Sequence, residues 1–134
     1  MNLKNFNSLS DLYENYKIIG NETSKEKESQ KIVDFIKERL EEIRNKYIQK
    51  EKKTVLFFLE DGTSIGQKTV IDDIVTICSG ENILTKRKVT GWTKIPLERL
   101  ASYKPDWIIT SVSQREKTNP QKKFLSHSVL KHFK

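Results

Sequence analysis

Apolar positions in the first part of the chain recur with a helical period. Residues 21–53 carry apolar side chains at steps of three and four, which predicts an amphipathic helix that packs on one side only. This stripe consists of Ile32, Ile36, Leu40, Ile43 and Tyr47. Thr23 or Ser24 is expected to cap the start of the helix. Residues 16–20 are expected to form a short extended piece that ends in a glycine turn.

Short, strongly apolar runs replace the helical pattern after residue 53. The run TVLFFL, residues 54–59, is β-branched and aromatic, which is typical of a strand covered on both faces. The run WIIT, residues 107–110, predicts another buried strand, and residues 82–84 predict a weaker one. Residues 69–79 have helical spacing, and this helix makes Cys78 a predicted core residue.

Two further helices complete the predicted order. A short helix is expected after Pro96. Its predicted inner face comprises Leu97, Leu100 and Ala101. Residues 119–134 predict a last helix. Strands that alternate with helices favour an α/β fold with a short, mostly parallel sheet. Two strong strands and a weak one are fewer than sheets usually have, so we expect the fold to be incomplete at the C-terminus.

The composition admits several kinds of partner. A chain of 134 residues suits one domain with a modest core. The net charge of +7 favours an anionic partner, such as nucleic acid, acidic lipid or a small anion. The lysines are spread along the chain, however, and many lie beside glutamate, so a solvated surface is the favoured explanation. A nucleic-acid-binding module remains an alternative, but no recognition motif supports it and we expect no nucleic acid partner.

Cysteine, histidine and apolar runs exclude several other classes. Cys78 is the only cysteine, and His127 and His132 have no neighbours with metal-ligand spacing, so neither a disulfide nor a metal site is expected. No apolar run reaches the length of about 18 residues that suggests a membrane span. The N-terminal residues contain no export signal.

The glycine-bearing segment after TVLFFL has the order of a phosphate-binding P-loop but not its spacing. A P-loop has four residues between its glycines, and lysine follows the second glycine directly. Here three residues separate Gly62 from Gly66, and Gln67 stands between Gly66 and Lys68. A nucleotide-binding enzyme is therefore the weaker alternative. Nothing pairs a nucleophile with a base, so we expect no catalytic residue and no enzyme.

Two longer segments carry a resemblance to a known family. They are EDGTSIGQKTVIDDIVTICSGENIL, residues 60–84, and GWTKIPLERLASYKPDWIITS, residues 91–111. They resemble the C-terminal lobe of substrate-binding proteins of ABC importers, of the type that serves ferric siderophores, haem and cobalamin. The second segment follows the family form S-x-E-x-(L/I)-x-x-x-x-P-D-x-I-I, with Pro96 where serine is frequent. Its matching residues are Glu98, Leu100, Pro105 and Asp106.

The helical region carries the rest of the resemblance. Members of the family join two lobes by a long, rigid helix that is entered through G-x-x-T-G-x-x-x-x-A. Gly20 and Thr23 match this entry, whereas Ser24 replaces the usual glycine and Ser29 the usual alanine.

The resemblance implies a division of the chain into two parts. Residues 1–53 would be an N-terminal segment and a long linker helix, and residues 54–134 a partial, Rossmann-like, three-layer binding lobe. A first lobe and the end of the second are missing from this pattern, so the chain resembles a truncated half.

The same resemblance implies a ligand site. In this family the ligand lies between the lobes, at the carboxyl ends of the strands. The resemblance therefore implies three loops near the ligand, at residues 62–66, 88–94 and 111–115. The implied ligand-binding residues are Gly62, Thr63, Ser64, Lys88, Trp92 and Ser113. Trp92 could stack on a macrocycle or a catechol ring, or alternatively pack on its own lobe. Lys86, Arg87 and Lys88 could attract an anionic chelate, or simply be solvated.

The implied partners follow from the family's role in import. Glu98 matches a glutamate that pairs with arginines of the membrane permease, although a first-turn glutamate also favours its own helix. The implied function is non-catalytic capture of a ferric chelate, haem or a corrinoid, without a cofactor. The full-length protein would be periplasmic or anchored at the cell surface. An incomplete sheet could also form a homodimer through its exposed edge.

Overall fold

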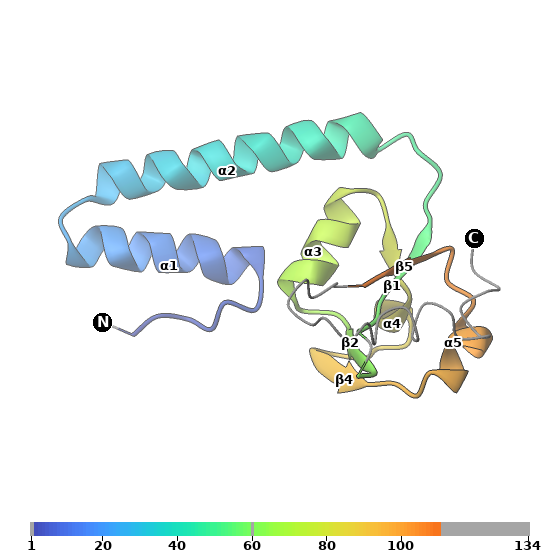
Figure 1. The fold of residues 1–134 in the computed structure, drawn as a ribbon. Helices are drawn as coiled ribbons and strands as arrows, with labels where there is room; N and C mark the ends of the chain where they lie inside the picture. The colour runs from blue at the N-terminus through green and yellow to red at the C-terminus, as the bar shows by residue number, and fades with distance from the viewer. Residues whose placement is uncertain (1, 60, 111–134) are drawn as a thin grey trace, which may run out of the picture. The chain divides into compact units, whose positions relative to one another are not determined.

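The computed structural model describes residues 2–59 and 61–110, which form two compact units (Figure 1). The helical unit comprises residues 2–51 and 68–79. The sheet unit comprises residues 52–59, 61–67 and 80–110. The predicted helix at 119–134 and the candidate Ser113 lie outside the described residues.

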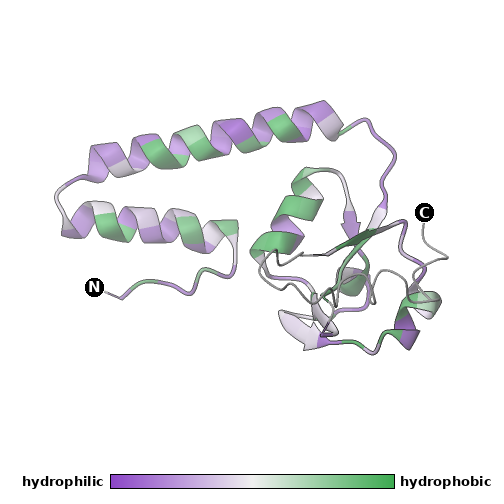
Figure 2. Ribbon diagram, viewed as in Figure 1, coloured by the Kyte–Doolittle hydropathy of each residue, from purple (hydrophilic) through white to green (hydrophobic). Residues whose placement is uncertain are grey.

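Three helices build the helical unit. They are α1 (Leu9–Glu22), α2 (Glu26–Tyr47) and α3 (Val70–Ile77). Helices α1 and α2 lie side by side and antiparallel (Figure 1), and α2 also contacts α3. Figure 2 shows hydrophilic and hydrophobic positions alternating along both long helices. Each of these helices therefore buries only one stripe of its surface.

The N-terminal part of the chain is more helical than its sequence pattern predicts. Residues 16–20 were expected to be extended, but they belong to α1, so this prediction is wrong. The reason is the role of Gly20, which is buried where α1 approaches α2. A Cβ atom at Gly20 would lie 2.6 Å from the Cβ of Ser29. This glycine is needed for a close helix crossing and not for a turn.

Neither of the two predicted cap residues caps α2. The hydroxyl of Thr23 donates a hydrogen bond of 2.7 Å to the carbonyl oxygen of Ile19, in the last turn of α1. Ser24 lies in the connection between the helices with a φ of 55°. Lys25 precedes α2 without a side-chain cap. The expectation of a Thr23 or Ser24 cap is therefore wrong, because both side chains lie in or after the end of a helix that was not predicted.

The buried stripe of α2 is rotated from the predicted one. Val33, which the predicted stripe omits, is completely buried. Ile36 and Leu40 are half-buried, whereas Ile32 and Ile43 are 42% and 39% exposed. The shift arises because α1 covers the side of α2 on which Val33 lies. The periodicity alone could not show which side of the helix would be covered.

A three-stranded parallel sheet organises the sheet unit. Its strands are β3 (Glu81–Asn82), β1 (Thr54–Phe57) and β5 (Trp107–Ile109), in this spatial order. Both strands that neighbour β1 run parallel to it. The predicted α/β fold with a short parallel sheet is thereby confirmed.

The remaining elements of the sheet unit connect these strands. They are β2 (Thr63–Ile65), α4 (Ile83–Lys86), β4 (Trp92–Lys94) and α5 (Glu98–Tyr103). Strands β2 and β4 pair antiparallel, and we call this pair the β2–β4 ribbon. The weak strand predicted at 82–84 is only partly right, because Asn82 ends β3 and caps α4. Its side-chain oxygen accepts a hydrogen bond from the N–H of Leu84 at 3.0 Å.

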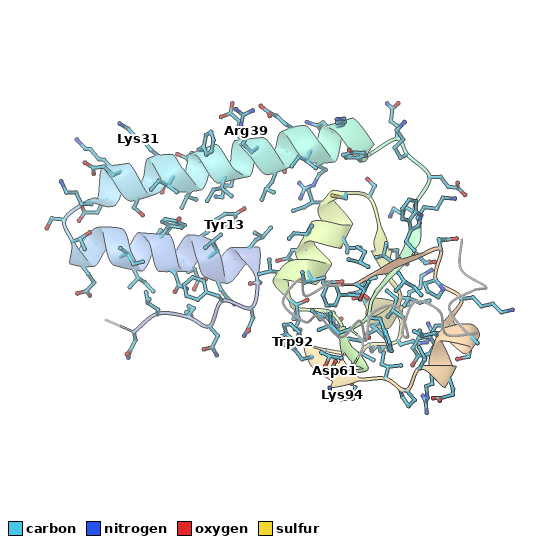
Figure 3. All side chains as sticks on the ribbon, in the orientation of Figure 1. Tyr13, Lys31, Arg39, Asp61, Trp92 and Lys94 are labelled. Atoms are coloured by element: carbon cyan, nitrogen blue, oxygen red, sulfur yellow. The ribbon has the colours of Figure 1, made fainter. Side chains whose placement is uncertain are left out.

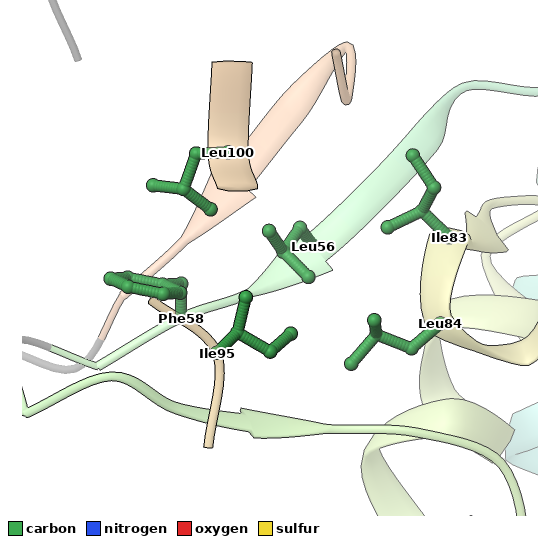
Figure 4. Packing of buried hydrophobic residues seen from close by; sticks show 6 residues of the cluster. All are labelled: Leu56, Phe58, Ile83, Leu84, Ile95 and Leu100. Atoms are coloured by element: carbon green, nitrogen blue, oxygen red, sulfur yellow. The ribbon is translucent and has the colours of Figure 1, made fainter. Parts of the chain in front are cut away.

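The core of the sheet unit is a compact apolar cluster (Figure 4). Its buried members are Leu56, Phe58, Ile83, Leu84, Ile95 and Leu100. Leu56 and Leu100 are completely buried. The helix predicted after Pro96 is confirmed as α5, and of its predicted inner face Leu100 is buried and Leu97 half-buried, whereas Ala101 is exposed.

Two residues expected in the core are exposed. Cys78 follows the last residue of α3, so it leaves the apolar face of that helix and lies at the surface. Trp107 was expected within a buried strand, but it is 63% exposed. Strand β5 ends the described sheet, and Trp107 is the first residue of that strand. Both predictions are wrong, because an apolar run does not reveal which of its members face outward.

The Pro105–Asp106 pair marks the start of β5. The Asp106 carboxylate accepts hydrogen bonds from the N–H and the hydroxyl of Thr54, at 2.7 and 2.8 Å. The N–H of Asp106 donates in return to the Thr54 hydroxyl oxygen at 3.0 Å. The hydrogen bonds from Thr54 lower the pKa of Asp106, and the bond from the N–H has a larger effect than the bond from the hydroxyl. The aspartate therefore ties the beginning of β5 to the beginning of β1.

Candidate functional site

Two segments that were expected to be loops each contain a paired strand. Residues 62–66 contain β2 and residues 88–94 contain β4. In the ribbon Thr63 lies opposite Lys94, and Ile65 lies opposite Trp92. The expectation of loops is wrong here, because pairing between distant segments converts them into strands. The third segment, residues 111–115, lies outside the described residues.

Backbone N–H groups along the ribbon are used within the ribbon. The N–H of Gly62 donates to the carbonyl oxygen of Leu59 at 2.9 Å. The N–H of Gly66 donates to the carbonyl oxygen of Gly91 at 2.8 Å. A phosphate cradle requires N–H groups that converge on the anion. These two donors point into the protein instead, so the glycines do not build a P-loop.

Trp92 presents the most exposed large apolar side chain of the sheet unit. Its side chain is 67% exposed, although Ile65, directly opposite on β2, is only 1% exposed. The chain turns back after β1, since Phe58 forms an isolated antiparallel bridge with Ser64 of β2. The indole is therefore displayed on β4, the strand that pairs with the segment following β1.

Three other candidate residues take part in building the ribbon. Gly62 has a φ of +81°, and a Cβ atom there would lie 2.9 Å from the carbonyl oxygen of Ile95. The hydroxyl of Thr63 donates to the Asp61 carboxylate at 2.9 Å. Ser64 is fully buried, and its hydroxyl has no hydrogen-bond partner among the described residues. Contact of these three residues with a ligand stays a prediction.

Sequence reasoning missed an ion pair at the end of the ribbon. The ammonium group of Lys94 contacts the carboxylate of Asp61 and donates to the Asp61 carbonyl oxygen at 3.1 Å. Figure 3 shows both residues close to Trp92 on the ribbon. The two residues are 33 positions apart. No local pattern could have paired them before the ribbon itself was known.

Asp61 is held in its charged form by this arrangement. Hydrogen bonds lower the pKa of Asp61 to about 2. The bond from Lys94 has the largest effect, and the bonds from the N–H and the hydroxyl of Thr63 have smaller ones. A carboxyl group with this pKa is ionised throughout neutral and mildly acidic conditions. The Asp61 carboxylate therefore carries its negative charge at neutral pH.

The basic residues at and after the end of α4 have different surroundings. Lys86 pairs with Glu81 at 2.7 Å. The guanidinium of Arg87 lies over the ring of Tyr103, 4.2 Å from its centre. Lys88 is exposed and adopts a φ of 58°. Lys88 thus lies at the surface in the connection to the ribbon, whereas Lys86 and Arg87 have contacts within the sheet unit.

Glu98 is exposed at the first position of α5. Its carboxylate can contact a partner, and a negative charge at this position also suits the start of a helix. The structure places Glu98 on a different element from Trp92. A partner bound at Glu98 would therefore contact α5, and a ligand stacked on Trp92 would contact the ribbon.

A separate open groove lies in the helical unit. Its volume is about 560 Å³. Its lining includes Leu9, Tyr13, Leu40, Arg44 and Asp73. The pKa of Tyr13 is raised, mainly by burial of the phenol and to a smaller extent by the negative charge of Asp73. None of the predicted site residues lines this groove, so it adds nothing to the candidate site on the ribbon.

The described part of the chain contains neither a metal-binding cluster nor a membrane-spanning helix. Over residues 2–59 and 61–110, no group of three or more histidine, cysteine, aspartate and glutamate side chains could hold a metal ion. No helix of this region combines the length and the apolar character needed to cross a membrane.

Comparison with known proteins gives the chain a family. Its residues 1–134 match the family model described as periplasmic binding protein. No curated protein sequence matches the chain.

Several solved structures share the fold. A possible iron-binding (periplasmic solute-binding) protein from Staphylococcus epidermidis is 21% identical, with a TM-score of 0.83 over 99% of this chain and 52% of that one. IsdE from S. aureus, solved with haem, is 25% identical, with a TM-score of 0.79 over 96% of this chain and 52% of IsdE. The periplasmic vitamin B12 binding protein BtuF from Vibrio cholerae is 18% identical, with a TM-score of 0.68 over 91% and 49%.

These likenesses agree with the architecture of the described residues. The chain spans about half the length of each of these three structures. The family match covers all 134 residues, and the parallel sheet with its flanking helices is the fold that the resemblance implied. The chain therefore belongs to the periplasmic binding protein family.

Proposed function

We propose that this chain is the ligand-capturing part of a substrate-binding protein that serves an ABC importer for ferric siderophores, haem or cobalamin. It would act outside the cytoplasm, without catalysis, and deliver its ligand to a membrane permease. The observation that carries the proposal is the exposed indole of Trp92, displayed on the β2–β4 ribbon. Haem, corrinoids and catecholate chelates all offer flat surfaces on which an indole can stack.

Related structures make the same ligand classes reasonable. IsdE is described in complex with haem, and BtuF as a vitamin B12 binding protein. Both ligands are large, flat and partly apolar, and such ligands suit a site with an aromatic side chain and few polar groups. Gly62, Thr63, Ser64, Lys88 and Ser113 remain predicted ligand contacts.

Replacing Trp92 by alanine is expected to weaken ligand binding about tenfold, since an aromatic contact contributes ~1.4 kcal/mol. The full chain is titrated with haemin, a ferric catecholate and cyanocobalamin, and absorbance or calorimetry follows binding. Mg-ATP and a short RNA serve as probes of the rival functions. The two tryptophans offer a matched control, because Trp107 is 63% exposed and Trp92 is 67% exposed.

The expected pattern is a loss of affinity for one probe in Trp92→Ala but not in Trp107→Ala. Equal affinities in both variants would remove Trp92 from the site. Binding of none of the three chelates by the unchanged chain would contradict the proposed function, and tight binding of Mg-ATP or RNA would replace it.

Glu98→Ala is expected to leave chelate binding and thermal stability unchanged and to weaken docking to the permease by about two- to fivefold, as exposed ion pairs usually do. Docking is measured with a cognate permease in lipid nanodiscs at low and high salt. Arg99→Ala, the adjacent exposed position on α5, is the control. The proposal for Glu98 fails if its removal abolishes chelate binding, or if docking is unaffected at low salt.

A further inference from the structure

The end of the β2–β4 ribbon farthest from Asp61 is closed by several hydrogen bonds. The N–H of Gly91 donates to the carbonyl oxygen of Gln67 at 2.9 Å, and the N–H of Gly66 donates to that of Gly91 at 2.8 Å. The side-chain amide of Gln67 donates to the hydroxyl of Thr90 at 3.0 Å. Backbone hydrogen bonds fix most of this end, so the loss of a single polar side chain is expected to alter it little.

The opposite end combines the contacts of one charged side chain with a backbone hydrogen bond of 2.8 Å from the N–H of Ile95 to the carbonyl oxygen of Gly62. The Asp61 carboxylate accepts hydrogen bonds from the N–H and the hydroxyl of Thr63, each of 2.9 Å, and it also binds the ammonium group of Lys94. Thr63 and Lys94 are directly opposite each other on the two strands. A single carboxylate therefore connects both members of one cross-strand pair, as well as the turn that precedes β2.

Trp92 is two residues from Lys94 on the same strand. Side chains two apart on a strand lie on the same face, so the indole and the Lys94 side chain share a face of the ribbon. Within residues 2–59 and 61–110, no hydrogen bond holds the Trp92 indole. The direction of this exposed ring consequently depends on the backbone of β4, and that backbone is fixed by its contacts on either side of Trp92.

We infer that Asp61 and Lys94 are positioning residues for Trp92: their ion pair fixes the end of β4, so that the indole is presented to the ligand in one orientation. The inference rests on the proposed function, because it assigns a role in ligand capture to residues that do not contact the ligand. A side chain that is already ordered before binding loses less conformational entropy on binding. The Asp61–Lys94 pair thus improves affinity by ordering the Trp92 side chain before binding, and not by contacting the ligand.

Because the Asp61–Lys94 pair is exposed, its role in positioning Trp92 can be tested without disturbing the fold. The side chains of Lys94 and Asp61 are 65% and 58% exposed. Exposed ion pairs contribute little to folding stability, so breaking this one should leave the fold intact. A second exposed pair in the same unit, Lys86 with Glu81, offers a matched control that is not on the ribbon.

The test uses the full chain with Trp107→Phe, which leaves Trp92 as the only tryptophan. Asp61→Asn, Lys94→Met, Lys94→Arg and the control Lys86→Met are each added to this background. Time-resolved fluorescence anisotropy measures the motion of the indole in the free protein. Haemin absorbance measures affinity, and thermal unfolding measures stability.

Asp61→Asn and Lys94→Met are both expected to increase fast motion of the indole and to weaken haemin binding about two- to tenfold, the cost of ordering one large side chain. Lys94→Arg should restore both properties, since arginine keeps the charge and the donors. Lys86→Met should change neither, and no variant should lower the unfolding temperature appreciably.

The outcomes separate this inference from the proposed function. Unchanged indole motion in Asp61→Asn overturns the positioning role, whatever haemin does. A loss of affinity in Lys94→Met but not in Asp61→Asn overturns it as well, because Lys94 would then contact the ligand directly. If the background chain binds neither haemin nor the ferric catecholate nor cyanocobalamin, the proposed function fails, and the anisotropy still shows whether the pair orders the indole.

Discussion

Replacing Gly66 by alanine is expected to destabilise the protein by about 3 kcal/mol, the upper part of the range for an overpacked site. A Cβ atom at Gly66 would lie 2.2 Å from the carbonyl oxygen of Val89 and 2.8 Å from its carbonyl carbon. This carbonyl cannot move freely, because it accepts a hydrogen bond of 2.8 Å from the N–H of Gln67. The added methyl group should therefore separate the strands of the ribbon.

Urea unfolding followed by tryptophan fluorescence measures this effect, and Gly91→Ala is the matched control. Gly91 has a φ of +69°, but a Cβ atom there would have nothing within 4 Å. Only the cost of the left-handed backbone remains, about 1 kcal/mol. If the two variants lost equal stability, the contact with Val89 would not be what requires glycine at position 66.

Replacing Gly20 by alanine is expected to destabilise the helical unit by about 1–2 kcal/mol, although alanine is the better helix former by up to ~1 kcal/mol. The new Cβ would lie 2.6 Å from the Cβ and 3.0 Å from the Oγ of Ser29. Ser29 is itself held in place, because its hydroxyl donates to the carbonyl oxygen of Tyr16. Steric crowding between the two helices should therefore outweigh the gain in helix propensity.

A double-mutant cycle with Ser29→Gly isolates this contact. Ser29→Gly removes the atoms that the new methyl group would meet, so Gly20→Ala should be neutral or stabilising in that background. The coupling energy is expected to be about 1–2 kcal/mol, measured by urea unfolding followed by circular dichroism at 222 nm. A coupling near zero would show that α1 and α2 can separate without loss, and that glycine at position 20 has another reason.

The two glycines illustrate how far a family motif can be understood from sequence. Gly20 was matched to the family's helix entry, but its pattern suggested a turn. The structure instead gives this residue a role in helix packing, and position 29 requires a small side chain for the same reason. The Pro105–Asp106 match is explained equally directly, because Asp106 bonds to Thr54 at the start of the neighbouring strand.

The sequence by itself determined the α/β class, the parallel strands and the order of the main elements. TVLFFL and WIIT are short apolar runs bounded by polar residues, and such local patterns suffice to predict β1 and β5. Helices α3 and α5 were also predictable from the sequence, since their apolar positions and their ends are encoded within a few residues.

Only the tertiary structure decided which faces are covered and which distant segments meet. Val33 is buried and Ile32 exposed because α1 lies on one side of α2, and Cys78 is exposed because α3 ends at Ile77. The β2–β4 ribbon and the Asp61–Lys94 pair join residues about 30 positions apart. Their pairing depends on how the whole chain folds back on itself, and the pattern within either segment does not contain that information.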